Sequence, residues 1–238
     1  MTPQRAITLA ADESEQVNSL SGTMSVQLGS TGTVSGTMQL QVRPSLLIGE
    51  KLNASISGQS TTISEILTST ALYMDIPGLS GQSGQPWTEV PFSDLSGSLG
   101  QALNQAVQEA ESGDPLTQTQ LLATSTNVRE VGTAVINGVS TTEYSGTVSP
   151  SAALNTLSPS LSKELAPELK MISGDISWSA WIDSQHMVRK LTENETIGGE
   201  AANVTVNVAS INQPVNVAVP PANQTYLLPA SALSGGGD

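Results

Sequence analysis

The residues that could support catalysis are few, and they lie close together near residue 183. His186 is the single histidine of the chain, Asp183 lies three residues before it, and serines are abundant. Serine, histidine and aspartate are the parts of a hydrolase triad. However, the sequence has no G-x-S-x-G motif, and the segment from Asp183 to His186 has the pattern of a turn between two strands. We therefore assign no catalytic residue, and we expect His186 to be dispensable.

Acidic side chains do not form a recognisable reaction centre or metal site. They occur in pairs at Asp12–Glu13, Glu109/Glu111 and Glu193/Glu195, and in each pair solvated carboxylates are expected rather than acid–base chemistry. No D-x-D-x-D-G loop indicates calcium binding. Because the chain has no cysteine, disulfides and thiolate metal sites are excluded. The sequence predicts neither a metal nor another cofactor.

The charge of the chain limits its partners. The formal net charge is -13, and Lys and Arg form no run. A polyanion repels phosphate backbones, so nucleic acid is excluded as a partner and adsorption to an anionic lipid surface is disfavoured. No window of about 18 consecutive apolar residues predicts a transmembrane helix.

Helical spacing of apolar residues recurs at the start of the chain and in its middle. Thr2–Pro3 is typical of a helix start, and Asp114–Pro115 repeats this pattern. Ser158–Pro159 starts a further short helix. The expected helices on one face of the fold cover residues 3–18, 93–111 and 115–124.

Between these helices the period of the pattern changes to two. Apolar and polar residues alternate through residues 21–76 and again through 126–211, and Asn137–Gly138 fits the type I′ turn of a hairpin. Strands that do not strictly alternate with helices favour an antiparallel α+β fold with one continuous sheet. We expect a single domain over residues 1–228 and a disordered tail over 229–238.

One set of apolar residues shares the inward phase of this alternation, and we expect it to face a common apolar space that binds a ligand. Leu103 and Val107 join the set because they are four apart on the expected helix 93–111. A packed core would need the same stripe, so the sequence leaves a cavity and a filled core both open, and it places Trp178 in the core. The candidate ligand-binding residues are Met24, Val26, Met38, Leu40, Leu72, Met74, Leu103, Val107 and Leu122.

A series of short motifs, taken in order, extends over most of the chain. The motifs are Leu72-Tyr73-Met74 with Pro77-Gly78, Pro86-Trp87, Asp114-Pro115 with Leu121-Leu122, Val131-Gly132, Asn137-Gly138-Val139 with Tyr144, Trp181-Ile182-Asp183 with Val188-Arg189-Lys190, Pro214-Val215, and Pro220-Pro221. This order resembles the LppX/LprG-type lipoproteins of actinobacteria and, more distantly, the LolA/LolB lipoprotein carriers.

The resemblance implies a fold and a function. It implies a large curved antiparallel β-sheet, or half-barrel, with helices packed on its concave face over an apolar cavity. Members of the family are exported to the cell envelope, are usually anchored by a lipidated cysteine, and several bind or move lipids and glycolipids. This chain has no such cysteine. We therefore expect membrane association only through a lipid anchor that this sequence has lost, together with its signal peptide.

Two hypotheses about the function follow, and they belong to different classes of protein. In the first, the protein is a monomeric, non-enzymatic binder or carrier of lipid or glycolipid acyl chains. In the second, it is a non-catalytic interaction or sensory module of the cell envelope with a filled core. A lipid that copurifies with the protein would distinguish the first hypothesis from the second.

Overall fold

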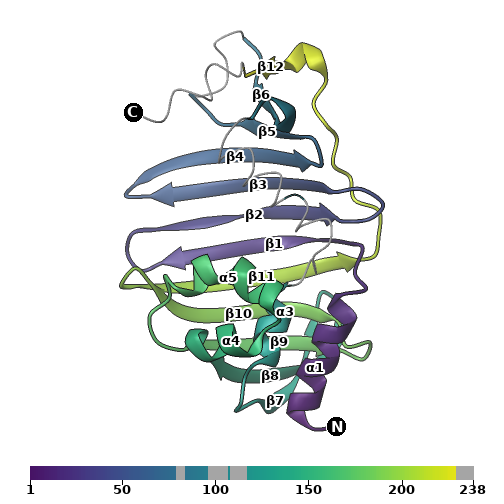
Figure 1. The fold of residues 1–238 in the computed structure, drawn as a ribbon, viewed down its shortest axis with the longest axis vertical. Coiled ribbons are helices and arrows are strands. Elements are labelled where there is room, and N and C mark those ends of the chain that lie inside the picture. The colour runs from purple at the N-terminus through teal and green to yellow at the C-terminus, as the bar shows by residue number, and fades with distance from the viewer. Residues whose placement is uncertain (79–83, 96–106, 108–116, 229–238) are drawn as a thin grey trace.

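The computed structural model describes residues 1–78, 84–95, 107 and 117–228 (Figure 1). The helices are α1 (Pro3–Ser14), α3 (Thr117–Ala123), α4 (Pro150–Thr156) and α5 (Pro159–Leu169), with the short 3-10 helices η1 (Phe92–Asp94) and η2 (Ala222–Gln224). The strands are β1 (Ser19–Leu28), β2 (Gly32–Gln41), β3 (Leu47–Ile56), β4 (Gln59–Thr68), β5 (Ala71–Asp75), β6 (Trp87–Pro91), β7 (Arg129–Ile136), β8 (Val139–Val148), β9 (Ile176–Asp183), β10 (Val188–Ile197), β11 (Glu200–Ile211) and β12 (Thr225–Leu227).

All of these strands belong to one 12-stranded sheet. Its order is β12-β6-β5-β4-β3-β2-β1-β11-β10-β9-β8-β7, and it is an open sheet that does not close into a barrel. Every neighbouring pair is antiparallel except β12 and β6, which run parallel. The predicted α+β class with one continuous antiparallel sheet is therefore confirmed.

The two halves of the sheet meet where β1 pairs with β11. The register runs from Leu20 opposite Ile211 to Leu28 opposite Ala202, with an irregularity at Ser21/Gly22. A Cβ atom added at Gly22 would lie 2.1 Å from the carbonyl oxygen of Asn207. Glycine therefore allows the two backbones to approach closely at this joint.

The described helices α1, α3, α4 and α5 all lie on one face of the sheet, over the half that contains β7–β11 (Figure 1). Thr2 caps α1 through its hydroxyl, which accepts from the N–H of Arg5, and Pro3 occupies the first turn as predicted. The main hydrophobic core lies between these helices and the sheet. Its buried members include Ile7, Leu121, Leu122, Leu165, Leu169, Ile176, Trp178, Ala180 and Ile182.

Two smaller clusters lie toward the other half of the sheet. Val42, Leu46, Phe92 and Val107 form one of them, and Leu40, Ile48, Leu67 and Leu72 pack against it. The other contains Val17, Leu20 and Val208, with Met38, Leu40 and Val206 packed against it. In the described part of the chain, no helix has the length and apolar character needed to cross a membrane.

Several boundaries differ from those that the sequence pattern predicts. The first helix ends at Ser14 rather than at residue 18, because the chain turns to enter β1 at Ser19. The helix predicted over 115–124 is observed as α3, Thr117–Ala123. Most of the helix predicted over 93–111 lies outside the described residues; Phe92–Asp94 forms η1, and Val107 is helical.

Candidate functional site

The two halves of the helix-bearing face, here called the inner face, differ in how well their side chains are buried. Under the helices, Trp178, Ala180 and Ile182 are 2%, 0% and 3% exposed. In β1–β5, the side chains of the same phase are only half-buried, except Leu20 at the start of β1. This half is called the apolar inner face of β1–β5; it consists of Met24, Val26, Val34, Met38, Leu40, Ile48, Leu52, Ile63, Leu67, Leu72 and Met74.

The pairing register aligns these side chains in rows that cross the strands. Directly opposite residues of antiparallel strands lie on the same face, so each row stays on one side of the sheet. One row runs through Leu20, Leu40, Ile48, Leu67 and Leu72. A parallel row contains Met24, Gly36, Leu52 and Ile63. Alternation within each strand therefore builds two apolar rows on this face of β1–β5.

Methionine contributes strongly to this surface. Met24, Met38 and Met74 lie on it, and they are three of the six methionines of the chain. An unbranched thioether side chain adapts to irregular apolar partners more readily than a branched one. This composition suits a surface that contacts flexible hydrocarbon.

Two carboxyl groups lie between the two apolar rows. Glu50 on β3 lies opposite Glu65 on β4, and the same row places Met38 and Met74 on either side of the pair. Burial raises the pKa of Glu50, and the negative charge of Glu65 raises it further. A carboxyl group that takes up a proton in this position gains a hydrogen that it can donate to a hydroxyl or carbonyl oxygen of a ligand.

The structure brings most of the predicted site residues together. Met24 and Val26 of β1, Met38 and Leu40 of β2, and Leu72 and Met74 of β5 share the inner face. Val107 is 6% exposed and lies in the cluster against which Leu40 and Leu72 pack.

The other two predicted residues lie elsewhere. Leu122 is 1% exposed and belongs to the main core with Ile7 and Trp178, so the structure does not bring it into the apolar inner face of β1–β5. Leu103 lies outside the described residues. Sequence analysis did not include Leu52, Ile63 or the Glu50–Glu65 pair, although the alternation of β3 and β4 carried the signal for all of them.

The prediction that Glu193 and Glu195 form a solvated pair is wrong for Glu193. Glu193 is 6% exposed, and its Oε1 atom has no hydrogen-bond partner within the described part of the molecule. Burial raises its pKa to about 7, with smaller contributions from the charges of Glu195 and Glu168. The cause is its position on β10 opposite Trp178, on the face that carries the main core.

The segment from Asp183 to Met187 is a turn, as the sequence predicts. The Asp183 carboxylate accepts from the backbone N–H groups of Gln185 and Met187 and from Arg189 Nε at 2.7 Å. His186 donates its backbone N–H to the carbonyl of Asp183 and has a φ of 62°. These contacts use Asp183 to hold the turn. Among the residues that the structure describes, no group of three or more His, Asp or Glu side chains is placed to hold a metal ion.

The sequence of this chain matches the model of a known protein family. Residues 114–217 match the LppX_LprAFG lipoprotein family. The predicted resemblance is confirmed. No curated protein matches the sequence of the chain.

Solved structures share the fold over almost the whole chain. LprF from Mycobacterium bovis is 15% identical with a TM-score of 0.55, and the match covers 92% of this chain and 96% of LprF. LppX from Mycobacterium tuberculosis is 19% identical with a TM-score of 0.52, and the match covers 91% of this chain and 98% of LppX. The large open antiparallel sheet with helices on one face is thus the fold of the lipoproteins LppX and LprF.

Proposed function

We propose that this protein is an exported, non-enzymatic cell-envelope protein that binds or carries lipid or glycolipid acyl chains on the apolar inner face of β1–β5. The observation that carries the proposal is the contrast in burial along one face of one sheet. The half under the helices is closed to solvent, whereas the half built from β1–β5 keeps a set of aliphatic and methionine side chains half-buried.

Hydrocarbon burial supplies the driving force for this function. Each methylene group that leaves water contributes about 0.8 kcal/mol, so an acyl chain laid along the rows of β1–β5 gains affinity without any charged contact. The Glu50–Glu65 pair lies within the same surface and offers carboxyl oxygens that can accept from a hydroxyl of a glycerol or sugar. Placement in the cell envelope is supported by the match of residues 114–217 to a lipoprotein family.

Two adjacent residues of β1 allow a sharp test. Met24 lies on the inner face, and Ser25 lies on the opposite, exposed face. We expect Met24→Glu to abolish binding of a fluorescent fatty-acid probe, because it places a charge among the apolar rows. Ser25→Glu introduces the same charge on the other side of the same strand and should leave probe binding unchanged.

Native mass spectrometry of the wild-type protein from a lipid-rich host provides the independent measurement. A discrete excess mass that disappears in Met24→Glu and persists in Ser25→Glu is expected. A bare protein mass, together with equal probe binding by both variants, would refute the carrier function and favour an interaction or sensory module with a filled core.

A further inference from the structure

The face opposite the helices, here called the outer face, carries long rows of uncharged polar side chains. Two adjacent rows cross the sheet from β4 to the segment that enters β7. The first contains Ser60, Ser55, Thr33, Gln27, Asn203, Asn194, Ser177, Thr147 and Asn127, and the second contains Thr62, Asn53, Ser35, Ser25, Thr205, Thr192, Ser179, Ser145 and Arg129.

The formal charge of these two rows is positive, whereas that of the whole chain is negative. The protein has 21 acidic and 8 basic residues, yet the two rows contain no carboxylate, and their one charged member is Arg129. A random selection from this composition would favour carboxylates. Within these two rows the only formal charge is therefore positive.

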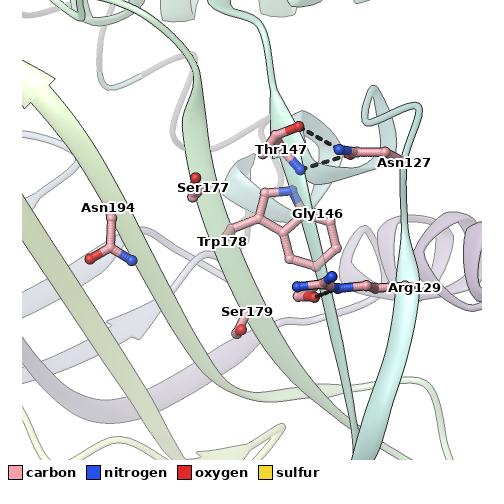
Figure 2. A pocket seen from close by; sticks show the side chains of 9 residues that line it. Asn127, Arg129, Gly146, Thr147, Ser177, Trp178, Ser179 and Asn194 are labelled. Atoms are coloured by element: carbon pink, nitrogen blue, oxygen red, sulfur yellow. Dashed lines mark hydrogen bonds between the residues drawn. The ribbon is translucent and has the colours of Figure 1, made fainter.

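These rows end in a hollow of about 470 Å³ (Figure 2). Polar side chains from β7, β8, β9, β10 and the segment before β7 line it, and none of the lining residues is acidic. Asn127 exchanges two hydrogen bonds with Thr147, which fixes this segment against β8. Trp178 packs against Gly146 at this point and stays buried in the main core, with 2% of its surface exposed.

Arg129 is oriented within this hollow by a single neutral contact. Its Nε donates to Ser145 Oγ at 2.9 Å, and Ser145 is 9% exposed. The ion pair found in the described part of the chain is Arg189 with Asp183, so Arg129 is held by a hydroxyl instead of a carboxylate. Its two Nη groups keep their hydrogens for another acceptor.

Three further donors come from neighbouring strands. Ser177 and Ser179 lie on β9, and Asn194 lies next to Ser177 on β10. The Asn194 side-chain oxygen accepts from Asn203 Nδ2, which leaves the amide hydrogens of Asn194 for a ligand. An arginine fork surrounded by hydroxyl and amide donors, with no carboxylate among the lining residues, matches the oxygens of a phosphate group.

We propose that this hollow on the outer face binds the phosphate group of a phosphate ester. The volume exceeds what one phosphate needs, so the remaining space accommodates a glycerol or sugar beside the phosphate. The site lies on the opposite side of the sheet from the proposed acyl-chain surface and does not depend on it. The phosphate belongs either to a free polar ester or to the headgroup of a lipid in a membrane.

Titration with inorganic phosphate, followed by amide chemical shifts at constant pH, tests the phosphate contact directly. We expect shifts at Ser145, Ser177, Ser179 and Asn194 that sodium chloride of equal ionic strength does not produce. Arg129→Gln should weaken phosphate binding at least about tenfold, the loss of roughly one good contact. Arg129→Lys keeps the charge but not the fork, and we expect an intermediate loss.

Lys51→Gln is the matched control, because Lys51 is an exposed cation of the same face on β3, away from the hollow. It should bind phosphate like the wild type. Thermal denaturation of each variant checks that the fold is intact, as expected for the exposed Arg129. Equal weakening by Lys51→Gln, or unchanged binding in Arg129→Gln, would show non-specific charge attraction and overturn the proposal.

Two further probes distinguish the sources of the phosphate. Glycerol 3-phosphate represents the free ester, and phosphatidylglycerol vesicles, compared with phosphatidylcholine vesicles, represent a membrane headgroup. Arg129-dependent binding of glycerol 3-phosphate alone assigns the site to a soluble ester, and Arg129-dependent binding of the vesicles assigns it to a headgroup. If neither they nor inorganic phosphate bind in an Arg129-dependent way, the proposal is wrong.

Discussion

At the scale of single residues, Glu193 is the group most out of place in its surroundings. Its carboxyl lies in the main core opposite Trp178, and burial raises its pKa from 4.5 to about 7. A group whose pKa is higher in the folded protein stabilises the fold below its unfolded pKa. That contribution is lost as the pH rises through the folded pKa.

We therefore expect the free energy of unfolding to fall by about 3 kcal/mol between about pH 4.5 and pH 7 because of Glu193. Glu193→Gln should remove this part of the pH dependence, because glutamine has no charged form. Urea denaturation across this pH range measures the effect. Asp12→Asn, at an exposed position on α1, is the control and should keep the wild-type pH profile.

His186 provides a second prediction at this scale. It lies in the Asp183–Met187 turn with a φ of 62°. We expect His186→Ala to cost at most about 1 kcal/mol, because histidine and alanine both carry the Cβ atom that makes the left-handed conformation costly, and to leave lipid-probe binding unchanged. A well-folded variant that loses the activity of the protein would instead give His186 a chemical role.

The positions of these two residues were not equally predictable. The turn at Asp183–His186 follows from local sequence. The burial of Glu193 does not, because the pairing of β9 with β10 shifts register between Val188 and Lys190. This bulge changes which positions of β10 point inward, and a strict alternation counted along the sequence misses the change.

At the scale of elements, the pairing of β1 with β11 holds the two halves of the sheet together. Gly22→Ala would place a Cβ atom 2.1 Å from the carbonyl oxygen of Asn207, and a backbone atom cannot move away cheaply. We expect a loss of about 2 kcal/mol or more in the free energy of unfolding. Thermal denaturation measures it.

Gly132→Ala on the edge strand β7 is the matched control, because a Cβ atom there meets nothing within 4 Å. Gly132→Ala should leave the midpoint of thermal denaturation nearly unchanged. Similar midpoints for the two variants would contradict this prediction. They would show that the backbones of β1 and β11 can separate enough to accommodate a Cβ atom at position 22.

The elements that sequence analysis missed are the short ones. β6 has five residues and β12 has three, too few to show an alternating pattern. β12 also pairs in parallel with β6, so its partner lies far away in the sequence. The long hairpins, by contrast, were predictable because Asn137–Gly138 supplies the positive φ angles of a tight turn, 50° and 82°.

At the scale of the whole molecule, the candidate ligand surface adjoins a packed cluster around Val107. Val107 is 6% exposed and packs with Val42, Leu46 and Phe92. We expect Val107→Trp to displace these neighbours at a cost of about 1–3 kcal/mol and to reduce lipid-probe binding through Leu40 and Leu72.

Denaturation midpoint and probe affinity, measured on the same samples, test this prediction. Val135→Trp on β7 is the control, because Val135 is 70% exposed and has room for the larger ring. A Val107→Trp variant as stable as the wild type would mean that unfilled space lies beside this cluster.

The overall class of the fold was predictable, whereas the strand order was not. The change of period from helical spacing to strict alternation marks the strands, and those patterns are local. The neighbour of β1 is β11, which comes from the opposite end of the chain, and no local pattern connects Leu20 with Ile211. The same limit explains why Leu122 was grouped with the residues of β1, β2 and β5.

The neighbouring positions of β1 and β11 also set an order for biosynthesis. Hairpins such as β1–β2 and β3–β4 can form as soon as they are made, but one edge of β1 has no partner until residues 200–211 have been synthesised. A chain released before that point presents the unpaired backbone of β1 to other chains, a template for aggregation. A protein with this topology therefore completes its sheet only after nearly all of the chain is available.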